Sequence, residues 1–220
     1  MIVEAEIARR IRDIRQRIAD LGGKDVSIIA VTKGFGIAEI RAAMKAGCSM
    51  VGENYAQEIR AKYAPVDPLE RPEIHFIGHL QSNKVAGLVS FVDVWQTVDR
   101  LSIVQTVAKQ VPGARVFIQV NATGETGKGG CQPHQVAELV SAARECGLEV
   151  LGLMTVGPTH NDRALTKAAF RTVALLRKEL GLAELSMGMS EDLDIAVPLG
   201  ATMVRMGRAI FGERPPKIGL

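Results

Sequence analysis

Apolar residues recur at every third or fourth position through the first twenty residues of the chain. These positions, separated by charged side chains, are Ile7, Ile11, Ile14, Ile18 and Leu21. A repeat of this length aligns the apolar side chains along one stripe of a helix. We therefore predict an amphipathic helix over residues 2–21, which Gly22 and Gly23 bring to an end.

After this helix, short apolar runs alternate with helical patterns along the rest of the chain. Eight runs are rich in aliphatic residues and predict strands at 26–31, 49–51, 74–77, 92–96, 116–120, 150–153, 184–186 and 202–206. Most of them are separated by segments of helical periodicity at 37–46, 55–63, 101–110, 135–146 and 163–180. Such alternation is typical of parallel βαβ units.

Eight strands in this arrangement favour a closed (β/α)8 TIM barrel, formed by residues 1–220 as a single domain. No linker divides the chain, and the proline-rich stretch 64–72 is short enough to be a connector. An open doubly wound sheet is the alternative fold. It would place a dinucleotide-binding turn after the first strand, where Lys33-Gly-Phe-Gly-Ile-Ala lacks the GxGxxG spacing.

Composition and charge narrow the class of protein. The chain is 47% hydrophobic but only 4% aromatic, so we expect an aliphatic core. A formal net charge of +3, spread along the chain, argues against a nucleic-acid partner. The charged N-terminal residues lack a long apolar run, so we expect neither a signal peptide nor a membrane partner. Three widely separated cysteines without a CxxC pattern indicate reduced thiols in a cytoplasmic protein.

Lys33 is the first candidate for chemistry. It follows the apolar run Val26–Thr32 directly and precedes Gly34-Phe35-Gly36, a turn signal. A lysine partly withdrawn from water has a lowered pKa, and its neutral amine can form a Schiff base with an aldehyde. Taken alone, a lysine at this place more often ends a strand in solvent, and the polar segments elsewhere in the chain are what favour the chemical interpretation.

Polar, glycine-rich segments follow six of the eight predicted strands. They are 52–58, 78–84, 121–130, 154–155, 186–190 and 205–208. The carboxyl ends of barrel strands share one rim, which is where barrel active sites are built. We therefore expect these segments, with Lys33, to surround one site.

Two of these segments suit a phosphate group. Residues 186–190 precede Glu191-Asp192, which we expect to open a helix, and Gly207 is expected to start a short helix after the last strand. Barrels often bind phosphate on backbone N–H groups at this place. Gly207 could equally be a packing glycine. Residues 122–129 lack the first glycine and the final Ser or Thr of GxxxxGK[ST], which argues against a nucleotide hydrolase.

The sequence does not favour a metal site. His75 and His79 are four residues apart but span a predicted strand end rather than a helix face, and HExxH is absent. The acidic residues 191, 192 and 194 suit the first turn of a helix, where the helix dipole favours negative charge.

Six stretches together resemble the pyridoxal phosphate homeostasis proteins, formerly called proline synthetase co-transcribed homologues. The stretches are AVTK at 30–33, GENY at 52–55, HFIGHLQSNK at 75–84, GLMT at 152–155, LSMGMSED at 185–192 and VRMGRAIFG at 204–212. They extend across nearly the whole chain. The departures are Gly34, the glycine-heavy segment 126–130 and Gly157, none of which removes a group assigned below.

This resemblance implies a barrel like the N-terminal domain of alanine racemase, with pyridoxal 5′-phosphate (PLP) bound as a Schiff base on Lys33. It also implies that Arg205 faces the pyridine nitrogen and that Asn54 lies near the ring. The other implied cofactor-binding residues are Ser186, Ser190, Gly207 and Arg208 around the phosphate, and Met187 in the pocket lining.

An arginine at the pyridine nitrogen favours a carrier over a catalyst. PLP withdraws electrons most strongly when this nitrogen is protonated, and arginine can only donate a hydrogen bond to the neutral nitrogen. In racemases with the same arginine, a second domain supplies a further base. The sequence after Gly212 is too short to encode such a domain, so we expect PLP buffering or delivery with little or no catalysis.

Two functional hypotheses remain at this stage. The first is a PLP carrier that acts in intracellular homeostasis, as a monomer, with apo PLP-dependent enzymes as candidate recipients. The alternative is an amino-acid racemase or related enzyme with weak activity. Amino-acid turnover above that of free cofactor would distinguish the enzyme from the carrier.

Overall fold

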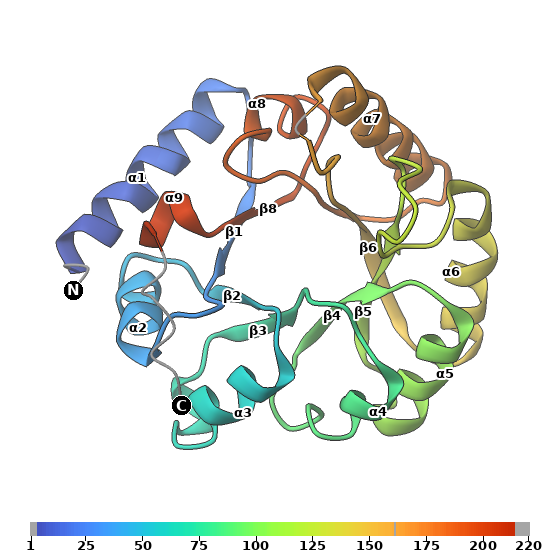
Figure 1. The fold of residues 1–220 in the computed structure, drawn as a ribbon, viewed down its shortest axis with the longest axis horizontal. Helices are drawn as coiled ribbons and strands as arrows, with labels where there is room; N and C mark the ends of the chain where they lie inside the picture. The colour runs from blue at the N-terminus through green and yellow to red at the C-terminus, as the bar shows by residue number, and fades with distance from the viewer. Residues whose placement is uncertain (1–3, 161, 214–220) are drawn as a thin grey trace.

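The computed structural model describes residues 4–160 and 162–213, and these form a closed barrel of eight parallel strands (Figure 1). The strands pair in chain order from β1 to β8, and β8 closes on β1. They are β1 (Ser27–Val31), β2 (Met50–Glu53), β3 (Glu73–Phe76), β4 (Val94–Val98), β5 (Arg115–Val120), β6 (Glu149–Thr155), β7 (Glu184–Ser186) and β8 (Met203–Met206).

Helices surround this barrel and connect its strands (Figure 1). The longer ones are α1 (Glu4–Asp20), α2 (Ile37–Lys45), α3 (Ala56–Tyr63), α5 (Leu101–Gln110), α6 (Val136–Glu145) and α7 (Arg163–Glu179). The short ones are α4 (Ser82–Val85), α8 (Leu193–Ala196) and α9 (Arg208–Phe211), with the 3-10 turns η1 (Pro68–Glu70) and η2 (Pro133–Gln135). No helix among the described residues is long and apolar enough to cross a membrane.

The predicted barrel is confirmed, since each of the eight apolar runs overlaps a strand. The boundaries differ by up to two residues, because strand ends are set by pairing with neighbours that a local pattern does not contain. The helix α4 begins inside the segment 78–84, which the sequence indicated only as polar, because one turn is too short to show a helical repeat. The predicted ends at residues 2 and 220 lie outside the described residues.

The helix α1 covers the seam where the barrel closes. Its buried residues are those of the predicted stripe, Ile7, Ile11, Ile14 and Ile18. Arg10 donates a hydrogen bond to the carbonyl of Ile210 in α9 at 3.3 Å, which ties the two ends of the described chain together. Figure 1 shows α1 and α9 side by side next to β1 and β8.

The core has two parts because alternate strand residues face opposite sides of the sheet. The larger part lies between strands and helices and contains most of the buried aliphatic residues. The smaller part fills the barrel interior with Ile29, Val94, Phe117, Met154 and Met203. Two residues after Val94 and Met203 on the same strands, the buried residues are polar: they are Gln96 and Arg205.

Candidate cofactor site at the carboxyl end of the barrel

Strand alternation places Arg205 on the inner side of the barrel, and Lys33 follows β1 in a turn with the same parity as an interior residue. Ile29 belongs to the interior cluster, and Lys33 lies four residues after it, so both have the same parity. Arg205 follows the interior residue Met203 by two positions. Because Ile29 and Arg205 are paired across β1 and β8, the two cationic residues come from neighbouring strands. The half-buried Lys33 is the farther of the two toward the carboxyl end.

The turn that carries Lys33 is fixed by polar contacts from α3. The amide of Gly34 donates to Glu58 at 2.8 Å, and the ammonium of Lys62 donates to the carbonyl of Thr32 at 2.8 Å. Gly34 has a φ of 79°, in the left-handed region that glycine adopts without strain. The backbone on both sides of Lys33 is therefore held by the same helix.

Lys62 also forms a buried ion pair with Glu53. The two charged groups are 2.9 Å apart, and the Glu53 side chain is fully buried. Its carboxylate also accepts from Thr32 Oγ1 at 2.8 Å and from the Tyr63 hydroxyl at 3.1 Å. Burial raises the pKa of the Glu53 carboxyl, and the positive charge of Lys62 opposes this shift. The pair is thus occupied in holding β1, β2 and α3 together.

Arg205 is buried and is held by three hydrogen bonds. Its Nη1 donates to the carbonyl and to the hydroxyl of Ser186, both at 2.8 Å, and its Nη2 donates to the carbonyl of Thr155 at 2.7 Å. Only 5% of the residue is exposed. Burial lowers the pKa of this guanidinium to about 10, and the charge of Asp192 opposes the shift. The group therefore remains a cation, and only a donor, at neutral pH.

Asn54 has an unmet capacity for hydrogen bonding. Its Oδ1 is buried and has no partner among the described residues. Asn54 follows β2 with interior parity, four residues after Met50, and its backbone is approached closely by Gly78. A Cβ at position 78 would lie 2.0 Å from the carbonyl oxygen of Asn54, so only glycine fits there. An orphaned acceptor at the barrel mouth suits a ligand with a hydroxyl or N–H donor.

Gly207, unlike Gly78, has room for a side chain within the protein. Its φ of −111° lies outside the left-handed region, and a Cβ there would meet nothing closer than Val31 Cβ at 3.5 Å, an ordinary contact. The packing of the protein therefore does not require glycine at this position. The backbone of Gly207 is open to a group that approaches more closely than a side chain would permit.

The remaining predicted site residues divide into two groups. Ser190 is half-buried and contacts Met206 at 3.8 Å, and the exposed Arg208 pairs with Glu191 at 3.4 Å, so both lie with Gly207 near the ends of β7 and β8. Ser186 and Met187 are fully buried. The Ser186 hydroxyl is engaged by Arg205, and Met187 packs in the core between strands and helices.

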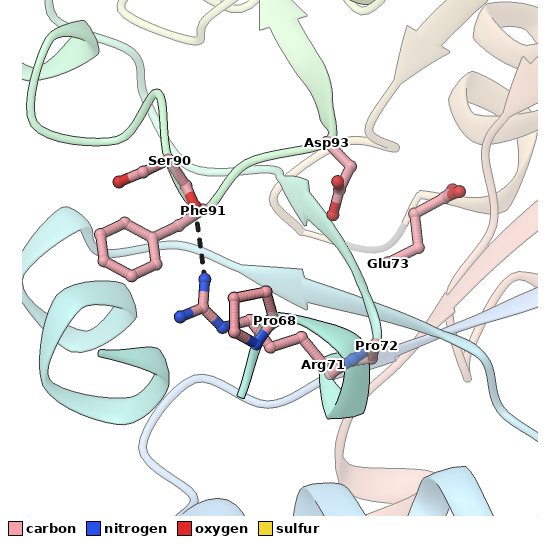
Figure 2. A pocket seen from close by; sticks show the side chains of 7 residues that line it. All are labelled: Pro68, Arg71, Pro72, Glu73, Ser90, Phe91 and Asp93. Atoms are coloured by element: carbon pink, nitrogen blue, oxygen red, sulfur yellow. Dashed lines mark hydrogen bonds between the residues drawn. The ribbon is translucent and has the colours of Figure 1, made fainter. Parts of the chain in front are cut away.

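A cavity of about 240 Å³ lies at the other end of the barrel. Figure 2 shows it between Arg71 on one side and the carboxylates of Glu73 and Asp93 on the other. Arg71 stacks on Phe91, 5.1 Å from its ring centroid, and donates to the carbonyl of Ser90. Glu73 begins β3 and Asp93 precedes β4, so this cavity is at the amino end and contains none of the predicted cofactor residues.

Gln96 and Lys62 were not predicted from the sequence as residues of the site. Gln96 contributes a polar group inside the barrel, where it contacts His75, and Lys62 supports the turn of Lys33 through its pair with Glu53. A signal existed for Gln96, because a glutamine in the apolar run VWQTV has to find buried partners. Within the described ranges, no group of three or more His, Cys, Asp or Glu side chains could hold a metal ion.

Comparison with known proteins identifies the class of this barrel. The family model described as alanine racemase, N-terminal domain, matches residues 2–215. The alanine racemase of Corynebacterium glutamicum, at 17% identity, has the same fold with a TM-score of 0.74 over 99% of this chain and 63% of that one. The chain thus spans somewhat under two thirds of that enzyme.

Relatives with higher identity specify the family. A protein of Pseudomonas aeruginosa named pyridoxal phosphate homeostasis protein is 40% identical over 96% of this chain and 94% of its own length. One of the same name from Schizosaccharomyces pombe is 36% identical over 88% of this chain and 86% of its own. PipY of Synechococcus elongatus, solved with PLP bound, matches at 32% identity and a TM-score of 0.79, over 94% of this chain and 100% of that one. The chain belongs to the pyridoxal phosphate homeostasis protein family.

Proposed function

We propose that this protein binds PLP through a Schiff base on Lys33 and serves intracellular PLP homeostasis, by buffering or delivering the cofactor. The observation that supports the proposal is that Lys33 follows β1, the strand paired with the β8 strand of Arg205, and that both residues have the parity of interior residues, Ile29 and Met203. One residue supplies an amine for the aldehyde, and the other supplies a fixed donor for the ring nitrogen.

The surrounding residues fit the rest of the cofactor. The unpartnered Oδ1 of Asn54 suits the ring hydroxyl, and the open backbone of Gly207 suits a phosphate oxygen. Ser190 and Arg208 lie beside Gly207 and add a hydroxyl and a positive charge. We assign Ser186 to the support of Arg205 and Met187 to the wall behind the site, because their contacts are with Arg205 and the core.

The electrostatics favour binding over catalysis. When bound, PLP supplies an electron sink for carbanion chemistry, and this sink is strongest with a protonated ring nitrogen. Arg205 favours the neutral nitrogen because its guanidinium stays charged near a pKa of about 10 and cannot accept a proton there. The buried carboxylate of Glu53 at the end of β2 is paired with Lys62 of α3 and so does not provide a free base.

A weak racemase or related enzyme is the second candidate function, and it is favoured by the shared barrel fold of the alanine racemases. The homeostasis function is expected to operate in the cytoplasm and in a monomer of one domain. The buried thiols of Cys48 and Cys131 agree with a reduced protein, since burial raises their pKa values to about 11 and about 12.

The proposal is tested by borohydride reduction of the PLP-loaded protein, followed by peptide mapping. The label should fall on Lys33, and Lys33→Ala should lose both the label and the visible absorbance band. Lys24→Ala, in the exposed bend before β1, is the matched control and should keep both. A labelled peptide elsewhere would refute the assignment.

Transfer and turnover measurements separate the two candidate functions. A carrier should reactivate an apo PLP-dependent enzyme faster than the loaded protein releases PLP into buffer. Amino-acid racemisation at ordinary enzymatic rates, about 1 to 1000 per second, would instead establish the enzyme.

A further inference from the structure

Five side chains form a continuous hydrogen-bonded series across the barrel interior. Arg205 donates to the Ser186 hydroxyl at 2.8 Å, and this hydroxyl is 2.7 Å from Gln96 Oε1. Gln96 Nε2 is 2.8 Å from His75 Nδ1, and His75 Nε2 is 2.7 Å from Glu73 Oε1. Ser186, Gln96 and His75 are fully buried, so water does not compete for their protons.

The two ends of the series fix the direction of every proton in it. Arg205 can only donate, so the Ser186 oxygen accepts from it and gives its own proton to Gln96 Oε1. Gln96 then donates through Nε2 to His75 Nδ1. His75 must therefore carry its proton on Nε2, which donates to the carboxylate of Glu73. A neutral imidazole in this one tautomer satisfies each group.

Protonation of His75 would break this order. With a proton also on Nδ1, the imidazole would need an acceptor, and the Gln96 amide would have to turn its oxygen toward the ring. Its nitrogen would then face Ser186, whose hydroxyl proton would lose its acceptor in the series. A buried hydroxyl without an acceptor costs free energy. The number of protons on the His75 ring is therefore coupled to the hydrogen bond between Ser186 and Arg205.

The series joins the two ends of the barrel. Arg205 lies toward the carboxyl end, whereas Glu73 lines the cavity at the amino end, as Figure 2 shows, and its other oxygen accepts from Arg115 at 3.2 Å. A third of the Glu73 side chain is exposed. The terminal acceptor is thus open to solvent at the end opposite the proposed PLP site.

We propose that Glu73, His75, Gln96 and Ser186 are positioning residues that hold Arg205 as an oriented donor through a fixed order of protons. The part of this proposal in which Arg205 donates to PLP rests on the proposed function. The order of protons does not, because it follows from contacts within the protein.

Nitrogen NMR of the cofactor-free protein tests the proton order directly. The His75 ring should appear as the single Nε2–H tautomer in neutral buffer. The exposed rings of His79, His134 and His160 serve as internal references and should exchange between tautomers. An Nδ1–H tautomer, or an imidazolium, at His75 would overturn the proposal.

Gln96→Glu provides a sharper test. The introduced carboxylate can only accept, so His75 has to donate through Nδ1 as well as Nε2. Its two nitrogen signals should then both become those of N–H groups, as in an imidazolium. If His75 keeps a bare Nδ1 in a folded variant, the series does not control its protonation.

The effect on Arg205 is tested with substitutions of Ser186. Ser186→Ala should weaken PLP binding about fivefold and shift the visible band, as expected for one lost hydrogen bond. Ser186→Thr restores the hydroxyl and should restore both. Thr97→Val, a buried neighbour of Gln96 whose hydroxyl has no partner among the described residues, should change neither. Equal binding by all three variants would refute the positioning role.

These outcomes are separable from those of the proposed function. Failure of the Lys33 label would remove the PLP assignment and leave the His75 tautomer intact. A wrong tautomer in a protein that still binds PLP through Lys33 would remove only the positioning series.

Discussion

The ammonium of Lys62 donates to the carbonyl of Thr32, the residue immediately before Lys33, while it also pairs with the buried carboxylate of Glu53. One buried cation therefore supports both the fold of the barrel and the backbone next to Lys33, the lysine proposed to bind PLP. Substitution of Lys62 should therefore change the stability of the protein, and this change can be measured.

Lys62→Met should lower the free energy of unfolding by about 3 to 5 kcal/mol at neutral pH, because it leaves the charge of Glu53 buried and unpaired. Lys45→Met, on the exposed face of α2, is the matched control and should change it by less than about 0.5 kcal/mol. Urea denaturation of both variants beside the wild type measures these differences.

The same variant should show a defined dependence on pH. Burial already raises the pKa of Glu53, and loss of Lys62 raises it further above that of the unfolded chain. The folded variant then binds this proton more tightly than the unfolded one, so its stability falls as pH rises between the two pKa values. The deficit relative to wild type should be smaller at pH 5 than at pH 8. An equal loss of stability at pH 5 and pH 8 would show that the buried charge of Glu53 does not destabilise the variant.

Gly207→Ala should reduce PLP affinity at least tenfold, roughly 1.4 kcal/mol, while it changes stability little. The protein leaves ordinary contact distance for the new Cβ, so the loss would come from the ligand. Titration of the cofactor-free protein with PLP measures the affinity. Gly78→Ala is the informative contrast, because its Cβ would collide with the Asn54 carbonyl and should destabilise the fold itself. Unchanged affinity in Gly207→Ala would place the phosphate elsewhere.

Arg205→Glu should increase slow transamination per bound PLP, since a carboxylate favours the protonated ring nitrogen. The change also removes three hydrogen bonds, so weaker binding is expected. Arg205→Gln is the control that removes the charge without adding a carboxylate. Rates are compared at saturating PLP by following the pyridoxamine product. Equal rates in both variants would show that the partner of the ring nitrogen does not limit the chemistry.

Glu73→Gln should flatten the acid limb of the stability curve. The hydrogen bond from His75 is the main cause that lowers the pKa of Glu73 in the folded protein. A lowered folded pKa gives stability that is present above the unfolded value and is lost as pH falls through the folded one. Wild type should therefore lose more stability than the variant below about pH 4.5. Glu149→Gln, exposed at the start of β6, should retain the wild-type acid limb.

The barrel could be predicted from local patterns. Its strands are short apolar runs, and its longer helices repeat buried apolar residues every three or four positions. The apolar runs of β1 and β8 and the stripe of α1 are visible in the sequence without any knowledge of neighbours. Lys33 and Arg205 could be located as candidates because each sits at or just after such a run.

The contacts within the interior could not be predicted in the same way. His75, Gln96 and Ser186 are far apart in the chain, and their hydrogen bonds depend on how barrel closure aligns β3, β4 and β7. The support that Lys62 gives to the backbone of Thr32 likewise depends on how α3 packs against the end of β1. Periodicity shows which face a residue occupies, but it does not show which residue of a distant strand it meets.

Closure of the barrel by β1 and β8 has a consequence for synthesis of the protein. Lys33 is made early and Arg205 late, and they become neighbours only when the last strand pairs with the first. A chain still emerging from the ribosome therefore has the amine but not its partner, and contacts so distant in sequence form late in folding. On the proposed function, a PLP site that needs both residues would therefore form only in molecules whose last strand has been made.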